Sequence, residues 1–286
     1  MIRSAITAAG SAAAKLIQLR NNGRDLYYAY SPTVRHAERM TPYGFSMIAG
    51  NSMHHRLMQD GTFEPDEVAL TAEYLEDSDV FVDIGANIGF YSCLARFLGK
   101  HAVVIEPQQQ NLRYVYANLL ANGWTDVEVF PLGLSGQAGI ETLYGVSSTG
   151  ASLVPGWAAQ PKGFKKTIPV STLDILLGSR FQGRKMFIKL DVEGFEYQVL
   201  LGCGEVLAMQ PKPTWMVEIC LSDYHPGGSN AHYRDTFAIF FDAGYQARAA
   251  NRDRTVISLA DIERRVKDGR SDSVTINYLM VPVESS

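Results

Sequence analysis

The feature that most constrains the fold is a short apolar run that ends in a glycine-rich turn. Residues 80–84 read Val-Phe-Val-Asp-Ile, a composition typical of a buried strand, and residues 85–89 read Gly-Ala-Asn-Ile-Gly. An apolar stripe at helical spacing follows to residue 98. A strand, a tight turn and a helix in this order begin a βαβ unit, so the sequence predicts an α/β protein with a mostly parallel sheet.

The alternation of strands and helices continues towards the C-terminus. Further strands are predicted over residues 102–105, 127–132, 186–190, 214–219 and 274–281. Helices are predicted over residues 67–75, 107–120, 194–207 and 233–242. A sheet of this kind binds its ligand beyond the carboxyl ends of the strands, so the loops at those ends are expected to line the functional site.

Two segments depart from this alternation. Residues 1–65 mix aromatic and polar side chains without a regular period, and we expect them to form an N-terminal cap on a domain that spans 66–286. Within that domain, residues 139–170 are rich in glycine, serine and proline, which predicts an inserted loop or hairpin. Insertions of this length are often functional.

The N-terminal 19 residues are rich in alanine, but Lys15 interrupts a run that is only weakly apolar. This favours an amphipathic helix over a secretion signal. No stretch of the sequence approaches the roughly 18 apolar residues of a membrane span, so we expect no transmembrane helix and a cytoplasmic protein.

The composition limits the class of partner. The 286 residues include 30 acidic and 26 basic side chains without a long run of either sign, which argues against nucleic-acid binding. A small or neutral acceptor molecule fits this composition better. The three cysteines are widely spaced and form no zinc-binding pair, so we expect reduced, buried thiols. The sequence leaves open whether the chain forms a homo-oligomer.

The turn after the first strand predicts a cofactor site. Gly85 and Gly89 allow the backbone to approach a ligand closely, and Glu106 ends the next strand 21 residues after Gly85. A carboxylate at that place can accept hydrogen bonds from the two hydroxyls of a ribose. The predicted cofactor-binding residues are Asp83, Gly85, Ala86, Asn87, Gly89, Glu106 and Leu134, with the loop at 133–135 beneath the adenine.

An NAD-dependent oxidoreductase is the main rival for this pattern. Its fingerprint requires a further glycine between the first and the last, and here Asn87 occupies the middle of the turn. Asp83 would repel a pyrophosphate, whereas it can pair with the positively charged amino or sulfonium group of S-adenosylmethionine. The methyl donor therefore fits the residues better than NAD does.

The motifs of this region resemble those of the FkbM-type methyltransferases. The similarity runs over roughly residues 64–220. It comprises the segment 81–92, Ile105-Glu106-Pro107 with Asn111 and Asn118, Ser171-Thr172-Leu173-Asp174, the Asp-Val-Glu-Gly-x-Glu block within 188–196, and Val217-Glu218-Ile219. The resemblance implies a class I methyltransferase fold, Rossmann-like, with seven strands of which the last is antiparallel. It also implies O-methylation of hydroxyl groups on sugars or other natural products.

Methyl transfer to a hydroxyl requires a positioned acceptor and a place for its proton. Asp191 and Glu218 follow neighbouring strands and are expected to face one site, where a divalent cation (Mg²⁺, Mn²⁺ or Ca²⁺) could relieve their repulsion. In the metal-free alternative, Lys189 balances the charge of Asp191 from the same face of the strand. His225, in a loop beyond the next strand, is the predicted general base. The predicted catalytic residues are thus Asp191, His225 and Lys189.

Other functions remain open at this stage. A nitrogen methyltransferase of the base-modifying kind would carry an Asn-Pro-Pro-aromatic motif, which the sequence lacks. A protein of the same fold that binds the cofactor without chemistry is a further alternative, because many functions share this sheet.

Overall fold

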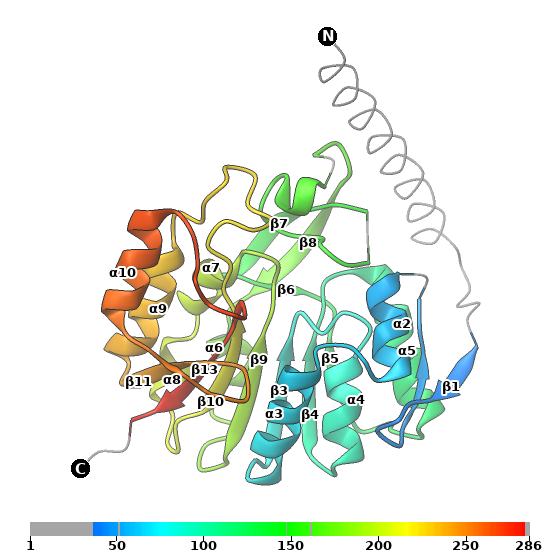
Figure 1. Cartoon of the computed structure of the whole chain (residues 1–286). Helices are drawn as coiled ribbons and strands as arrows, with labels where there is room; N and C mark the ends of the chain where they lie inside the picture. Colours follow the sequence, from blue (N-terminus) through cyan, green and yellow to red (C-terminus); the bar gives the residue numbers. More distant parts are fainter. Residues whose placement is uncertain (1–36, 51, 147, 161, 284–286) are drawn as a thin grey trace.

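The computed structural model describes residues 37–50, 52–146, 148–160 and 162–283. Its centre is an eight-stranded sheet in the order β12-β11-β13-β10-β9-β3-β4-β5 (Figure 1). In this order the strands are β12 (Val256–Ile257), β11 (Tyr245–Ala249), β13 (Asn277–Pro282), β10 (Thr214–Glu218), β9 (Met186–Leu190), β3 (Val80–Ile84), β4 (His101–Ile105) and β5 (Glu128–Phe130).

The sheet confirms the predicted fold class. Strands β10, β9, β3, β4 and β5 pair in parallel, and β13 pairs antiparallel with both β10 and β11. The six strands predicted by residue are all present, β11 completes the seven that the resemblance implies, and the two-residue β12 adds an eighth at one edge. The chain passes from β3 outward to β4 and β5 before it returns to β9 on the other side of β3. This reversal puts a switch point at the carboxyl ends of β3 and β9.

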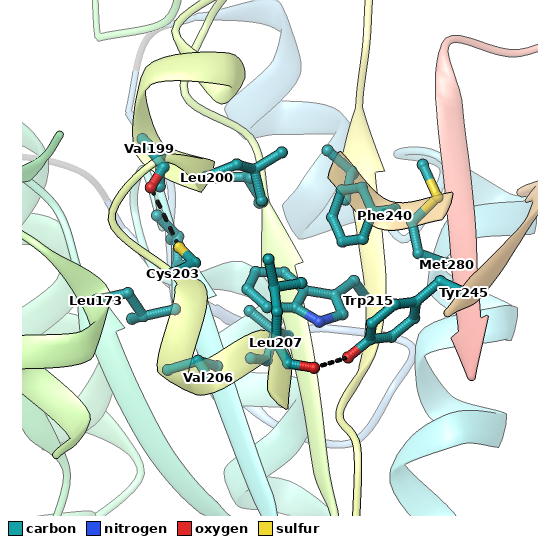
Figure 2. Close-up of a cluster of buried hydrophobic side chains, with 14 of the residues drawn as sticks. Leu173, Val199, Leu200, Cys203, Val206, Leu207, Trp215, Phe240, Tyr245 and Met280 are labelled. Atoms are coloured by element: carbon teal, nitrogen blue, oxygen red, sulfur yellow. Dashed lines mark hydrogen bonds between the residues drawn. The ribbon is translucent and has the colours of Figure 1, made fainter. Parts of the chain in front are cut away.

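Helices cover both faces of the sheet. They are α2 (Met53–Asp60), α3 (Pro65–Glu76), α4 (Phe90–Phe97), α5 (Gln109–Ala121), α6 (Leu173–Leu177), α7 (Glu196–Leu200), α8 (Gly204–Ala208), α9 (Tyr233–Asp242) and α10 (Leu259–Asp268). Successive strand residues point to opposite faces, so Val80 and Val82 belong to one apolar core and Phe81 to the other. Figure 2 shows part of the first core, where Trp215 of β10 packs beside Phe240 of α9.

One predicted helix, over residues 194–207, is wrong as a single element, because the structure divides it into α7 and α8. The backbone at Gly202 passes so close to Ser135 that a Cβ on residue 202 would lie 2.6 Å from the carbonyl oxygen of Ser135. Asp174 then accepts hydrogen bonds from the backbone N–H groups of Glu205 and Val206 and so starts the second helix. The terminal strand also begins later than predicted, at Asn277.

The insertion forms a small sheet of its own above the main one (Figure 1). Strand β7 (Gly139–Tyr144) pairs antiparallel with β8 (Lys165–Ser171), and β6 (Gly133–Leu134) pairs in parallel with β8. Between β7 and β8 the chain makes a short 3-10 turn, η1 (Trp157–Ala159).

Ahead of the main sheet, β1 (Glu38–Met40) and β2 (Ser46–Ile48) form a short hairpin followed by α2. The hairpin is fixed to α5 because the side-chain oxygens of Asn118 and Asn122 accept hydrogen bonds from β2. The amphipathic helix predicted for residues 1–19 lies outside the described residues. Within the part of the chain that the structure describes, no helix combines the length and apolar character needed to cross a bilayer. The three cysteines are free and buried.

Candidate active site

A cavity of about 400 Å³ lies at the switch point, where the loops after β3, β4, β5, β9 and β10 converge. Its volume falls within the range of small-molecule sites. It brings together most of the residues predicted for the site, namely Asp83, Gly85, Ala86, Asn87, Glu106, Leu134, Lys189, Asp191 and Glu218. Gly89 and His225 are not among the lining residues.

Gly85 is required by the contact between two turns, and it also lines the cavity. Its φ of +82° lies in the left-handed region, and a Cβ at this position would lie only 1.8 Å from the carbonyl oxygen of Asp191. The backbone N–H of Asp191 in turn donates to the carbonyl of Ile84 at 3.0 Å. The turn after β3 and the turn after β9 are therefore packed backbone to backbone.

Asn87 connects this turn to two distant segments. Its φ is +53°, a conformation that asparagine tolerates better than most residues. Its side-chain oxygen lies 2.8 Å from Nε2 of His55 in α2, and its side-chain nitrogen donates to the carbonyl of Ser148 in the insertion at 2.9 Å. Asn111 donates to the same carbonyl at 3.0 Å. The asparagine in place of a middle glycine thus links the N-terminal segment and the insertion to the turn.

Glu106 is nearly inaccessible to solvent, with 5% of its surface exposed. Its two carboxylate oxygens accept hydrogen bonds from the backbone N–H groups of Asn87 at 2.8 Å and Gln108 at 2.7 Å. Burial raises the pKa of Glu106 to about 8 despite these bonds. The side chain of Asn111 forms a further hydrogen bond with this carboxyl group, so three of its roughly four acceptor sites are used, and Glu106 lines the cavity.

Asp83 points to the α4 side of the sheet. Its carboxylate accepts a hydrogen bond of 2.5 Å from the hydroxyl of Ser92, and burial raises its pKa to about 6. It also lines the cavity next to Gly85. Leu134 is buried in β6 and also lines the cavity.

Lys189 and Asp191 form a buried ion pair at the end of β9. The ammonium group donates to Oδ2 of Asp191 at 2.6 Å and lies 4.8 Å from the ring centre of Tyr91. Burial alone would lower the pKa of Lys189, but the carboxylates of Asp191 and Glu64 raise it above its usual value, so the side chain stays charged. Glu64 accepts a hydrogen bond from the hydroxyl of Tyr91 at 2.7 Å. The cation therefore lies among carboxylates that come from separate parts of the chain.

Glu218 is the pocket carboxylate with the weakest described contacts. The thiol of Cys220, at 3.8 Å, is the one donor found for it among the described residues. Burial and the nearby Asp191 raise the pKa of Glu218 well above its usual value. Its oxygens are thus left to interact with whatever enters the cavity.

The predicted metal site was tested against this geometry. Among the described residues, no group of three or more histidine, cysteine and carboxylate side chains is arranged to hold a metal ion. The positive charge beside Asp191 is supplied by Lys189, as the metal-free alternative requires.

Glu193 fastens the insertion to the turn after β9. Its carboxylate accepts hydrogen bonds from the backbone N–H of Gly150 at 2.9 Å and from Nε1 of Trp157 at 2.6 Å. Its backbone carbonyl accepts another from the hydroxyl of Ser152. Gly194 has a φ of +89°, and a Cβ there would lie 2.2 Å from the Trp157 ring. The insertion therefore closes one side of the cavity.

His225 packs against Trp157 of the insertion. Its ring meets that of Trp157 edge to face with centroids 4.7 Å apart, and burial lowers its pKa. Its Nε2 is buried without a hydrogen-bond partner among the described residues. The neighbouring Tyr224 does line the cavity and is 57% exposed.

Backbone strain is concentrated around the cavity. Seven non-glycine residues have a positive φ within the described ranges, and five of them line the cavity: Glu64, Asn87, Ala158, Glu193 and Tyr224. Left-handed conformations at such residues are costly and tend to persist at functional sites.

Sequence reasoning missed several lining residues, including Glu64, Tyr91, Gln160 and Tyr224. Tyr91 was seen only as part of an apolar helical stripe. Tyr224 carried a usable signal, since it is an aromatic residue in a glycine- and proline-containing loop just beyond a strand end. Glu64 and Gln160 carried none, because only tertiary packing brings them to the switch point.

The buried acids predict a specific pH dependence of stability. Burial raises the pKa of Asp83 to about 6 and the pKa of Glu193 to about 7. It raises the pKa of Glu106 and of Glu196 to about 8. The folded protein therefore binds more protons than the unfolded chain between about pH 4.5 and 8, so its stability falls as pH rises through this window. Thermal unfolding of the ligand-free protein at pH 5, 6, 7 and 8 should show a steadily decreasing Tm. A Tm that is flat or rises over this range would contradict the assignment.

A sequence profile described as the Methyltransferase FkbM domain matches residues 83–247. No curated protein matches the chain. Among solved structures, the fold resembles precorrin-6y C5,15-methyltransferase from Geobacter metallireducens GS-15, with 14% identity, 70% of this chain and 78% of that one covered, and a TM-score of 0.37. It also resembles an rRNA methylase from Streptococcus thermophilus, with 12% identity, 74% and 90% covered, and a TM-score of 0.37.

A third similar structure is an O-methyltransferase family protein from Burkholderia thailandensis, with 8% identity, 80% of this chain and 58% of that one covered, and a TM-score of 0.39. The profile match spans more than half of the 286 residues and contains both the turn after β3 and the strand ends that form the cavity. The chain therefore belongs to the FkbM methyltransferase family and is an S-adenosylmethionine-dependent methyltransferase.

Proposed function

We propose that the protein transfers the methyl group of S-adenosylmethionine to a hydroxyl oxygen of a sugar, glycan or other natural-product acceptor. The observation that carries this proposal is the composition of one cavity. A buried acceptor for ribose hydroxyls, Glu106, and the Lys189–Asp191 pair line the same space of about 400 Å³. A cofactor and an acceptor can thus meet without either leaving the switch point.

The residues present fit the cofactor. Glu106 keeps acceptor capacity for the ribose hydroxyls, and Leu134 offers an apolar surface to the adenine. Asp83 and the backbone of Gly85 and Ala86 line the part of the cavity between β3 and β9, where the charged methionine end is expected. When bound, the cofactor supplies an electrophilic methyl group on a sulfonium. The acids around it favour that positive charge.

On the acceptor side, Asp191 is proposed to orient the acceptor hydroxyl and to take up its proton. Lys189 holds the carboxylate in place through their 2.6 Å hydrogen bond and balances its charge. This arrangement supports the metal-free alternative. His225 is proposed to act through packing rather than as a base, since its ring lies against Trp157 and not along the cavity.

Calorimetric titration and product analysis test the proposal together. S-adenosylmethionine and S-adenosylhomocysteine should bind and NAD should not. With cofactor carrying a ¹³C-labelled methyl group, and with excess chelator present, the label should appear on an oxygen of a hydroxyl acceptor, which NMR identifies. A label on nitrogen would exclude the O-methyltransferase assignment. Loss of turnover in chelator that Mg²⁺ restores would favour the metal at Asp191 and Glu218.

A further inference from the structure

The cavity mouth carries an aromatic ring that the proposed chemistry does not use. Tyr224 lines the cavity, yet 57% of its surface is exposed, so its ring is accessible to a ligand. An aromatic side chain that lines a small-molecule cavity and stays accessible is suited to contact a ligand.

The position of this ring is actively held. Tyr224 has a φ of +65°, a conformation that is strained for a tyrosine. Its carbonyl accepts a hydrogen bond of 2.8 Å from the backbone N–H of Ala158, and its ring packs on the Trp157 ring with centroids 5.8 Å apart. Trp157 is in turn fixed by Glu193 and by the His225 ring. The fold thus maintains an exposed aromatic platform at an energetic cost, which a structural role alone does not require.

The polar lining beside this platform favours hydrogen-bond donors. Glu218 has no conventional hydrogen-bond partner among the described residues, and a ligand hydroxyl, which both donates and accepts, would satisfy this side chain in either protonation state. Asp191 has one described partner, which is Lys189. An acceptor with several hydroxyl groups would satisfy both side chains, whereas a ligand with a single hydroxyl would not.

The same lining disfavours anions. Among the described residues of the cavity, Lys189 alone carries a permanent positive charge, and its ammonium group is already bonded to Asp191. A phosphate, sulfate or carboxylate on the acceptor would therefore find no available lysine or arginine there.

We propose that Tyr224, together with Glu218 and Asp191, forms a subsite for an uncharged pyranose ring, with the apolar C–H face of the sugar stacked on Tyr224 and its hydroxyls hydrogen-bonded to the two acidic side chains. This inference rests on the proposed O-methyltransferase function and narrows its acceptor class. A sugar ring combines the three properties that the subsite requires: a flat apolar face, several donors and no charge.

Saturation-transfer NMR on the protein loaded with S-adenosylhomocysteine tests the subsite without relying on turnover. The probes are the methyl α-glycopyranosides of glucose, galactose and mannose, together with glucose 6-phosphate. At least one methyl glycoside should receive saturation on its ring C–H protons, and the phosphate should bind at least about tenfold more weakly than the best methyl glycoside, because its charge would lose water without gaining a lysine or arginine partner.

Two substitutions distinguish the contribution of the Tyr224 ring from that of its backbone conformation. Tyr224→Gly removes the platform while it relieves the positive φ, so the fold should persist, and binding of the best methyl glycoside should weaken about tenfold. Tyr224→Phe keeps the aromatic ring and should retain binding of the methyl glycoside. Tyr116→Ala is the matched control, since Tyr116 is 47% exposed on α5 and does not line the cavity. Binding of S-adenosylhomocysteine should be unchanged in all three variants.

The outcomes separate the two proposals. Failure of S-adenosylhomocysteine to bind would overturn the cofactor assignment itself. If it binds, the subsite is overturned by any of three results: no saturation on any methyl glycoside, equal glycoside binding in wild type and Tyr224→Gly, or equal binding of glucose 6-phosphate.

Discussion

Gly85→Ala is expected to destabilise the protein by about 3–5 kcal/mol and to abolish cofactor binding. Two costs add at this position. The left-handed φ of +82° is unfavourable for alanine, and the new Cβ would lie 1.8 Å from the carbonyl oxygen of Asp191, a backbone atom that cannot rotate away. Relief requires the turns after β3 and β9 to separate, which would displace the Lys189–Asp191 pair.

Gly99→Ala is the matched control. Gly99 has a similar φ of +76°, but a Cβ there would meet no atom within 4 Å, so only the conformational cost of about 1–2 kcal/mol is expected. Denaturant unfolding of both variants measures the difference. Equal destabilisation of the two would show that contact with Asp191 contributes nothing, and the turn-to-turn packing described above would then be wrong.

The contrast between these two glycines shows what sequence alone could provide. Both strand and turn were predictable around Gly85, because a β-rich run followed by glycines is a local pattern. The contact that requires a glycine at this position was not predictable. The sequence suggested room for a ligand, and the structure adds a close contact with a turn that lies about a hundred residues further along the chain.

The same distinction explains which site residues were found. Glu106 and Asp191 end strands of a parallel sheet, so the fold class by itself brings them to one edge. Glu64 and Gln160 belong to segments without a regular period. Their approach to the cavity depends on bonds such as those of Asn87 with His55 and Ser148, which no local pattern reveals.

The helix predicted over residues 194–207 failed for a related reason. Its apolar residues follow a helical period across the whole stretch, but the close approach of Gly202 to Ser135 interrupts it. Tertiary contact thus overrides a continuous local pattern.

The second large effect is expected at Glu106. Glu106→Ala should weaken binding of S-adenosylhomocysteine by about 2–4 kcal/mol, because two hydrogen bonds to a buried acid are lost and their partners are left unpaired. Part of that loss would come from the turn, because the carboxylate also accepts the backbone N–H groups of Asn87 and Gln108. The substitution alone therefore does not separate a ribose contact from support of the turn.

A ligand analogue makes the separation. If Glu106 bonds the ribose directly, wild type should prefer S-adenosylhomocysteine over its 2′,3′-dideoxy form, and Glu106→Ala should lose that preference, with any loss of affinity for the dideoxy form measuring the contribution of the turn. If Glu106 only supports the turn, the variant should weaken both ligands equally. Glu141→Ala, which removes an exposed acid from β7, should alter neither affinity. Calorimetric titration of wild type and of Glu106→Ala, each with both ligands, decides between the two roles. An unchanged dissociation constant for S-adenosylhomocysteine in Glu106→Ala would exclude both.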